Sequence, residues 1–252
     1  MNCHVIHLDE TTSTNTYLAS YTPPSPTEVT VVTAEFQSAG RGQTGNTWES
    51  ERGTNLLFSI MVQPHSLPAA SAFLLSEAIA LSIREAVASF LTRHSSFISV
   101  KWPNDIYVGD RKIAGILIEN TMCGQYVQRS IIGCGVNVNQ QVFHSDAPNP
   151  VSLYQLIGQN IDRQALLNDI ITVFLRRYET LTLPLHTEYL AALYRRTGFH
   201  PYRDAHGQFL AEIVDVELTG HLLLRDESGH LRRYAFKEVE YRYKNLRFFD
   251  VI

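Results

Sequence analysis

The segment from Ser71 to His94 is the feature of this sequence that most restricts its fold. Its polar residues recur every three or four positions, and nearly all of the residues between them are apolar. Such a pattern is typical of a helix that exposes one narrow stripe and buries the rest of its surface. The chain has 252 residues, 44% of them hydrophobic, and can therefore bury a core of ordinary size around this helix. We expect the exposed stripe to consist of Ser82, Glu85, Ser89 and Thr92.

Segments on both sides of this helix have the composition of β-strands. Residues 109–111 form a tight turn, which predicts a hairpin between the two strands that flank it. Further helices are expected after residues 11–15, from an N-cap at Asp162, and over residues 188–196. The candidate strands span residues 4–8, 29–36, 54–62, 98–102, 106–108, 112–119 and 126–138. The chain is therefore predicted to be an α+β protein with a mixed β-sheet and packed helices.

After Gly198 the sequence contains only short, closely spaced strand candidates. These span residues 209–218, 222–225, 232–236 and 246–249, with turns between them at 219–220 and 227–230. Short strands without an intervening helix are typical of a small barrel. We therefore predict a second, smaller β domain and place the boundary near residues 198–204.

Charge and composition exclude several classes of protein. The formal net charge is −4, so the chain lacks the basic surplus that nucleic-acid binding usually requires. No run approaches the roughly 18 apolar residues of a membrane helix, and the first residues do not form a secretory signal. The three cysteines are far apart, which suits reduced thiols in a cytoplasmic protein better than disulfides. They are Cys3, Cys123 and Cys134.

A glycine-rich loop over residues 37–48 is the first candidate binding element. Three glycines within six residues allow a ligand to approach the backbone and direct N–H groups toward an anion. Arg41 adds a planar guanidinium group for a carboxylate or phosphate, and Trp48 offers a lid or a stacking surface. The loop has neither the P-loop spacing nor the dinucleotide-binding spacing. On this pattern alone, an ordinary surface loop is an equally good interpretation.

The second candidate is the string Lys101, Trp102, Pro103, Asn104 and Asp105. Pro103 restricts Trp102 to an extended conformation, so the polar residues are displayed together at the end of a strand. A lysine can stabilise phosphate charge, and an aspartate can hold a metal or orient an amine. The alternative is a structural turn with a surface ion pair.

Lys112 introduces a charge into an otherwise apolar strand. A buried charge costs several kcal/mol without an anionic partner, so a buried Lys112 would need one. The alternative is that Lys112 lies at the exposed start of the strand. Gly115 within the same strand predicts a bulge or a ligand pressed against the backbone, and Gly133 and Gly135 repeat that signal. Asn137 has the donor and acceptor of an amide, which suit an adenine edge, a phosphate or a turn.

Metal-dependent and covalent chemistries find little support. The ten histidines form no H-x-x-x-H pair and no cluster with cysteine, so we expect no protein-ligated zinc. The G-x-S-x-G pattern is absent. Cys134 lacks a convincing base, so we expect no covalent nucleophile.

In their order and approximate spacing, these segments resemble the biotin protein ligase family, also called biotin–acetyl-CoA-carboxylase ligases. The resemblance covers nearly the whole chain, and its most specific part is the string over residues 101–105 followed by residues 112–117. It implies a class II synthetase-like catalytic domain over residues 1–200 and an SH3-like β-barrel over residues 201–252. It also implies that biotin and Mg·ATP give biotinyl-5′-AMP and pyrophosphate. The adenylate then acylates one lysine of a biotin carboxyl carrier domain.

The resemblance also implies roles for individual residues. The implied biotin-binding residues are Ser13, Thr14, Asn15, Gln37, Gly40, Arg41, Gly42, Gln43, Lys112 and Gly115. Those for ATP and the adenylate are Trp48, Lys101, Asn104, Lys112 and Asn137, and the catalytic residues are Arg41, Lys101, Asp105 and Lys112. Arg41 and Lys112 would hold the carboxylate and the α-phosphate. Asp105 would position the attacking lysine or a magnesium ion that arrives with ATP, and no other metal site is implied.

The chain departs from the family pattern in two places. The family loop commonly carries two further arginines where this chain has Gln43 and Asn46, so we expect weaker retention of the adenylate. The first substrate motif begins at Ser13, which leaves no room for the helix-turn-helix of the repressor members, so we expect no operator binding. The sequence leaves open whether the protein is a monomer or a homodimer.

Two other functions compete with this interpretation. A lipoate or octanoate ligase would share the related fold and the carrier lysine, but the string over residues 101–105 favours biotin. A non-catalytic, biotin-binding regulator is disfavoured because Arg41, Lys101, Asp105 and Lys112 all occur together.

Replacement of Gln43 by arginine tests the first departure. We expect Gln43→Arg to slow dissociation of biotinyl-AMP by at least about twofold, because a charge-assisted hydrogen bond is roughly twice as strong as a neutral one. The release rate of the labelled adenylate measures this effect. A smaller change would show that the missing arginine does not weaken retention.

Overall fold

The computed structural model describes residues 2–43, 45–64, 66–91, 97–145 and 149–242. The chain divides into two compact units, Met1–Tyr194 and Arg195–Ile252. The strand expected over residues 246–249 lies outside the described residues.

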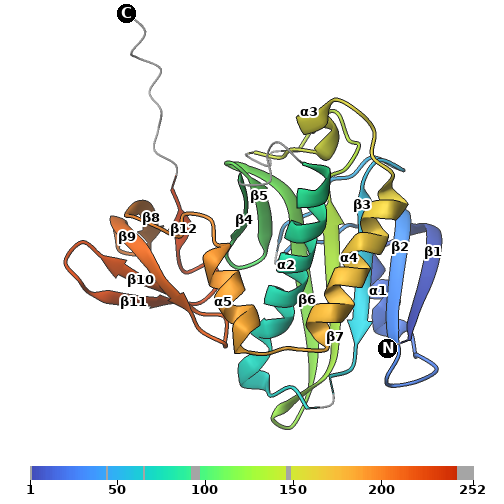
Figure 1. The fold of residues 1–252 in the computed structure, drawn as a ribbon, viewed down its shortest axis with the longest axis horizontal. Coiled ribbons are helices and arrows are strands. Elements are labelled where there is room, and N and C mark those ends of the chain that lie inside the picture. Colours follow the sequence, from blue (N-terminus) through green and yellow to red (C-terminus); the bar gives the residue numbers. More distant parts are fainter. Residues whose placement is uncertain (1, 44, 65, 92–96, 146–148, 243–252) are drawn as a thin grey trace, which may run out of the picture. The chain divides into compact units, whose positions relative to one another are not determined.

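The first unit is built on a seven-stranded mixed sheet (Figure 1). Its strands run in the order β1-β2-β3-β7-β6-β5-β4; β1 and β2 are parallel, and every other neighbouring pair is antiparallel. The β5–β6 hairpin turns at Gly109, which confirms the expected turn. The strands are β1 (Cys3–Thr11), β2 (Val29–Gln37), β3 (Leu56–Val62), β4 (Ile98–Lys101), β5 (Asp105–Val108), β6 (Arg111–Cys123) and β7 (Tyr126–Val136).

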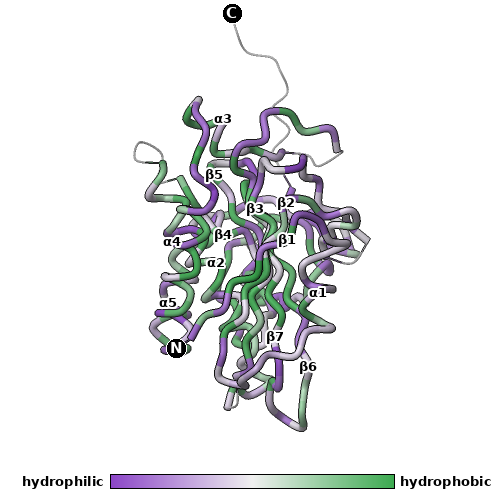
Figure 2. The backbone as a smooth tube through the Cα atoms, turned by 90° about the vertical axis from the view of Figure 1, so that its right-hand side faces the viewer, coloured by the Kyte–Doolittle hydropathy of each residue, from purple (hydrophilic) through white to green (hydrophobic). Residues whose placement is uncertain are grey.

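Helices cover both faces of this sheet, which confirms the predicted α+β class. Figure 2 shows α2 (Phe73–Phe90) and α4 (Arg163–Tyr178) on one side of the sheet and α1 (Thr14–Ser20) on the other. Strand β3 therefore lies between two layers of helix, and all seven of its residues are buried. On the α1 side, Leu18 packs against Val32, Met61 and Ile131.

The long apolar helix differs from its prediction on its polar face. Glu85 and Ser89 are exposed as expected, but Ser82 is fully buried and its hydroxyl donates to the Ala78 carbonyl at 2.6 Å. Thr92 lies outside the described residues. The stripe is narrower than predicted because α4 and α5 (Leu183–Ala191) both pack against α2. The polar residue Glu77 is also buried and lies 2.6 Å from Nδ1 of His186 on α5.

Two other helices differ from the sequence analysis. Helix α5 begins at Leu183 and ends at Ala191, so the expected range of 188–196 was wrong. Pro184 belongs to the first turn of this helix, where a missing N–H costs nothing. The five-residue helix α3 (Leu153–Ile157) was not predicted. It is stabilised by a capping box between Ser152 and Gln155.

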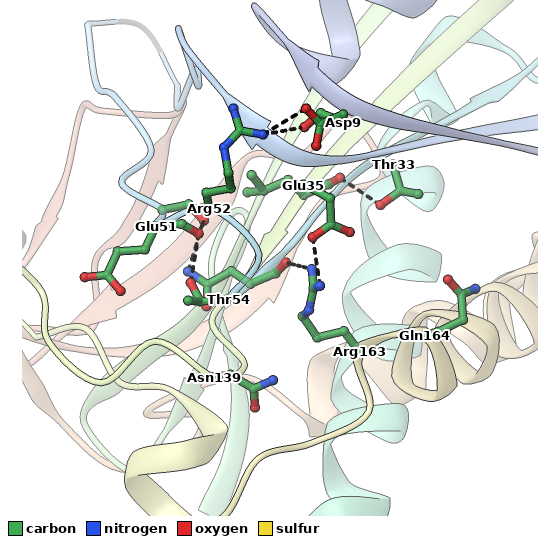
Figure 3. Close-up of polar contacts among 12 residues, drawn as sticks. Asp9, Thr33, Glu35, Glu51, Arg52, Thr54, Asn139, Arg163 and Gln164 are labelled. Carbon is green, nitrogen blue, oxygen red and sulfur yellow. Dashed lines mark hydrogen bonds and ion pairs between the residues drawn. The ribbon is translucent and has the colours of Figure 1, made fainter.

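Helix α4 begins as predicted. The carboxylate of Asp162 accepts hydrogen bonds from the N–H groups of Gln164 and Ala165. The guanidinium of the next residue, Arg163, donates to Glu35 on β2 at 2.8 Å (Figure 3). It also donates to the Asn55 carbonyl at 3.1 Å. The start of α4 is thereby fixed to the segment that leads into β3.

The second unit contains a five-stranded antiparallel sheet in the order β11-β10-β9-β8-β12. The expected β character of this region is confirmed, although β8 and β12 were not predicted, and closure of the sheet into a barrel stays a prediction. The strands are β8 (His200–Asp204), β9 (Gly207–Val216), β10 (Leu222–Asp226), β11 (Leu231–Tyr234) and β12 (Glu240–Tyr241).

Removal of the α4 cap should cost measurable stability. We expect Asp162→Ala to lower the free energy of unfolding by about 1 kcal/mol, because two N–H groups lose their acceptor. Urea denaturation measures the change. The matched control is Asp169→Ala on the exposed face of the same helix, which should change stability by less than about 0.5 kcal/mol. Equal losses in the two variants would contradict the role of the cap.

Candidate active site

Lys112 and Asp105 form a close ion pair on neighbouring strands. Nζ of Lys112 on β6 lies 2.6 Å from Oδ1 of Asp105 at the start of β5. The side chains are 30% and 19% exposed, so both charges are largely removed from solvent. Of the two alternatives that the sequence left open for Lys112, an anionic partner or an exposed strand start, the structure provides the partner. A bulge between Ile106 and Tyr107 shifts the register of this strand pair.

The other two polar residues of the string over 101–105 have different partners. Nζ of Lys101 donates to the Tyr107 hydroxyl at 3.0 Å and lies 4.9 Å from the centre of that ring. The side-chain amide of Asn104 donates to the Ile116 carbonyl at 2.5 Å, and the Ile116 amide donates to the Asn104 carbonyl. Asn104 therefore fixes the turn between β4 and β5 against β6, and Lys101 and Asp105 flank this turn.

The indole of Trp48 lies on a floor made by two glycines. Gly115 on β6 and Gly135 on β7 are directly opposite each other in the sheet. A Cβ at Gly115 would lie only 2.8 Å from the indole, and one at Gly135 would overlap it. Nζ of Lys112 lies 5.5 Å from the centre of the indole. The sequence predicted a bulge or a ligand against the backbone of Gly115, and in the structure the indole of Trp48 takes this place.

The glycine-rich loop that carries Trp48 folds as a small hairpin. The Gly42 amide donates to the Asn46 carbonyl at 2.8 Å, and the Trp48 amide donates to the Gly40 carbonyl at 3.1 Å. A Cβ at Gly40 would lie 2.9 Å from the Trp48 carbonyl oxygen, so glycine permits this close approach. Within the described residues, Nε1 of Trp48 and Oε1 of Gln43 are buried without a hydrogen-bond partner. Both atoms therefore remain available to a ligand.

A second polar group surrounds the start of α1. Oε1 of Gln37 accepts hydrogen bonds from the amide and the hydroxyl of Thr14 at 2.7 and 3.1 Å. The hydroxyl of Ser59 lies 2.7 Å from Oγ1 of Thr14 and 2.6 Å from Oδ1 of Asn15. Ser13 is buried at the N-cap position, but its side chain makes no capping hydrogen bond. The predicted residues Ser13, Thr14, Asn15 and Gln37 thus come together.

Asn15 connects this group to Arg41. The side-chain amide of Asn15 donates to Oε2 of Glu119 at 2.7 Å, and the same oxygen accepts a hydrogen bond from Arg41 at 2.9 Å. Arg41 and Glu119 are 45% and 42% exposed, so this ion pair is worth little on its own. Asn15 lies directly on Gly133, where a Cβ would overlap its side chain.

The two groups lie next to each other on one face of the sheet. Asn15 covers Gly133 and Trp48 covers Gly135, which are two residues apart on β7 and therefore share a face. This separation is about 7 Å along the strand. The same face carries α1, so β6 and β7 present one continuous surface that is polar at Asn15 and cationic at Lys112.

Asn137 follows the end of β7 and is buried. Its side-chain amide donates to the Val151 carbonyl at 3.2 Å, and its backbone amide donates to the Ile113 carbonyl at 2.8 Å. Oδ1 of Asn137 is buried and has no hydrogen-bond partner among the described residues. The structure therefore leaves one amide acceptor of Asn137 for a ligand.

Sequence reasoning missed two members of these groups, Ser59 and Glu119. Ser59 is the single polar residue of the otherwise apolar strand β3, and this exception was an available signal. Glu119 was recognised only as part of a motif. Its contacts with Asn15 and Arg41 join residues that are 104 and 78 positions apart, which a linear pattern does not reveal.

Cys134 is not a nucleophile in this site. It is buried, and burial raises the pKa of its thiol well above the usual range, so the unreactive protonated form prevails at neutral pH. Among the described residues, no three His, Cys, Asp or Glu side chains gather in a way that would bind a metal ion. None of the described helices is long and apolar enough to span a membrane.

Comparison with known proteins identifies the family. Residues 8–137, just over half of the chain, match the model of the biotin/lipoate A/B protein ligase family. The chain belongs to this family. It is 28% identical to the bifunctional ligase/repressor BirA of Bacillus spizizenii over 93% of this chain and 73% of that protein. It is 29% identical to the biotin–[acetyl-CoA-carboxylase] ligase of Paracoccus denitrificans over 79% of this chain and 85% of that protein.

A solved member of the family has the same fold. The biotin protein ligase from Aquifex aeolicus, solved in complex with biotin and ATP, superimposes with a TM-score of 0.76. The alignment covers 96% of this chain and 99% of that chain at 23% identity. The mixed sheet and helices are therefore the fold of a family member, as the sequence predicted.

Substitution of Gly135 tests the glycine floor. We expect Gly135→Ala to displace the indole of Trp48 at a cost of about 1–3 kcal/mol in stability. The exposed indole should emit at longer wavelength and be quenched more strongly by acrylamide. Subtraction of the spectra of matched Trp48→Phe variants removes the contribution of Trp102, which is 4% exposed. Unchanged quenching would contradict the contact between Trp48 and Gly135.

Proposed function

We infer that this chain activates biotin with ATP and transfers the biotinyl group to a lysine of a biotin carboxyl carrier domain. The observation that carries this inference is the shared face of β6 and β7. On this face a neutral polar group at Asn15 and a cationic group at Lys112 lie beside the bare backbone of Gly115, Gly133 and Gly135. The BirA and Paracoccus relatives, which are named as ligases, support the same reaction.

In the first step, one carboxylate oxygen of biotin attacks the α-phosphorus of ATP. The new O–P bond forms as the bond from the α-phosphorus to the bridging oxygen breaks, and pyrophosphate leaves with that electron pair. Negative charge gathers on phosphate oxygens, which positioned cations stabilise. Lys112, beside Asp105, and Arg41, beside Glu119, supply these cations.

The uncharged head of biotin suits the neutral polar group. A ureido ring presents N–H donors and one carbonyl acceptor, which amides and hydroxyls satisfy without a buried charge. Ser13, Thr14, Asn15 and Gln37 offer these groups, and Gly40, Gly42 and Gln43 bring the loop backbone over the ligand. Biotin extended from there reaches Gly115 and Lys112.

The nucleotide occupies the other end of the face. Trp48 provides an aromatic surface for the adenine, and the unpaired Oδ1 of Asn137 accepts a hydrogen bond from its amino group. Lys101 and Asn104 border the phosphates. Magnesium is bound mainly by substrate phosphates in sites of this kind, and Asp105 is the carboxylate that would complete its ligands.

In the second step, the amine of the carrier lysine attacks the acyl carbon of biotinyl-AMP. The new C–N bond forms as the bond to the phosphate oxygen breaks, AMP leaves, and the nitrogen loses a proton. Asp105 positions the amine from its place beside Lys112. We assign both steps to residues 1–200, and an SH3-like domain to residues 201–252.

The cellular setting is part of the same proposal. Free Cys3, Cys123 and Cys134 suit a cytoplasmic protein, and a net charge of −4 disfavours nucleic acid as a partner. The protein acts as a monomer or a homodimer. Because the family also contains lipoate ligases, parallel assays with biotin, lipoate and octanoate distinguish the acids.

Removal of either cation should abolish most of the first step. We expect Lys112→Ala and Arg41→Ala to lower the rate of biotin-dependent ATP–pyrophosphate exchange by about 10²–10³-fold, while the fold is kept. Arg225→Ala, on a surface pair with Glu212 in the second unit, is the matched control and should retain full exchange. Normal exchange by both site variants would refute the assignment.

A further inference from the structure

Three side chains behind the Trp48 loop form a cluster that the proposed reaction does not use. We call this cluster the amide clamp, and it consists of Asn55, Gln140 and Glu49. Gln140 and Asn55 are 0% and 1% exposed, and the side-chain amide of Asn55 donates to Oε1 of Gln140 at 2.6 Å. The amide of Gln140 donates to the Val142 carbonyl at 2.9 Å and to Glu49 at 3.3 Å. Two buried amides are thereby satisfied by each other and by one carboxylate.

The clamp is anchored to the start of α4 and to the segment after β7. Asn55 directly precedes β3, and its carbonyl accepts the hydrogen bond from Arg163 at the start of α4. Oδ1 of Asn55 accepts a hydrogen bond from the amide of Val138 at 2.9 Å. Val138 is the neighbour of Asn137, so the clamp fixes the segment that carries this proposed adenine contact.

The other end of the clamp lies beside Trp48. Glu49 follows Trp48 in the chain, and its two carboxylate oxygens accept the amides of His144 and Ser145, each at 2.7 Å. Two successive N–H groups that point at one anion form a favourable nest. Burial would raise the pKa of Glu49, but the hydrogen bonds from Ser145 and His144 outweigh it and lower the pKa, so the carboxylate is charged at neutral pH.

We propose that Glu49 and Gln140 are positioning residues that hold Trp48 and Asn137 in the geometry required by the adenine of ATP. The two adenine contacts lie on chain segments about 90 residues apart, and the hydrogen bond between Glu49 and Gln140 joins these segments directly. The polar group proposed for the ureido ring of biotin, around Thr14 and Gln37, makes its hydrogen bonds apart from the clamp, so the clamp acts mainly on the ATP side of the site. This inference rests on the proposed function.

Glu49→Ala tests the proposal, because it removes the hydrogen bonds that the carboxylate accepts from Gln140, His144 and Ser145 at a partly exposed position. We expect the KM for ATP to rise about 3- to 10-fold, since part of the positioning energy of charged hydrogen bonds is lost. The KM for biotin and kcat should change by less than about twofold, because the group at Thr14 is intact. Glu49→Gln keeps one uncharged acceptor and should fall between Glu49→Ala and the unmodified protein.

Glu51→Ala is the matched control. It removes the same charge from the same loop, but the Glu51 carboxylate makes no hydrogen bond or ion pair within the described part of the chain, and Figure 3 shows it without a dashed line. All three kinetic constants should stay unchanged. Equal effects of Glu49→Ala and Glu51→Ala would overturn the proposal, as would an equal rise in both KM values.

A measurement without substrates separates this inference from the proposed function. Acrylamide quenching of Trp48, obtained by subtraction of Trp48→Phe spectra, should increase in Glu49→Ala and stay constant in Glu51→Ala. Unchanged quenching in Glu49→Ala would overturn the clamp. If the unmodified protein showed no biotin-dependent use of ATP while quenching increased, the proposed function would fall and the clamp would stand. Increased quenching with an unchanged KM for ATP would refute the positioning role.

Discussion

The absence of side chains at three positions in the sheet is the constraint on which the candidate site depends. Gly133 and Gly135 on β7 and Gly115 on β6 leave bare backbone on one face, and Asn15 and Trp48 lie directly on it. Glycine weakens a strand, because its backbone loses more conformational entropy on folding and it has no side chain to pack. Strand β7 tolerates this cost because it is paired on both edges, with β3 and β6. The centre of the sheet is thus where a ligand can approach the backbone most closely.

The charges of the site are arranged so that they can exchange partners. Lys112 is paired with Asp105, and Arg41 with Glu119, so each cation has an anionic partner within the protein. All four side chains keep some contact with solvent, which limits the strength of each pair. A phosphate or carboxylate can therefore replace an internal partner at small net cost, whereas a fully buried ion pair would resist the exchange.

Local patterns predicted the parts of this protein that depend on nearby residues. Apolar periodicity located α2 and most strands, and the cost of a buried charge reduced the alternatives for Lys112 to an anionic partner or an exposed strand start. Ser82 was placed wrongly, because a serine can be buried when its hydroxyl bonds to the preceding turn. Contacts such as that of Glu49 with His144 could not be predicted, because they join segments 95 residues apart. Only the folded topology brings such segments together.

The position of Trp48 affects any ligand that approaches this face of the sheet. Its indole lies directly on the backbone of Gly115 and Gly135. A planar ligand that binds against Gly115 and Gly135 must displace the indole of Trp48. The displaced indole can then stack against that ligand. The loop is held by backbone hydrogen bonds and by the hydrogen bonds of Glu49. Gln43 and Asn46 are uncharged and add no ion pair to it. The affinity for such a ligand therefore depends on the difference in free energy between the ligand and the indole at this position. The hydrogen bonds that anchor the loop contribute to that difference.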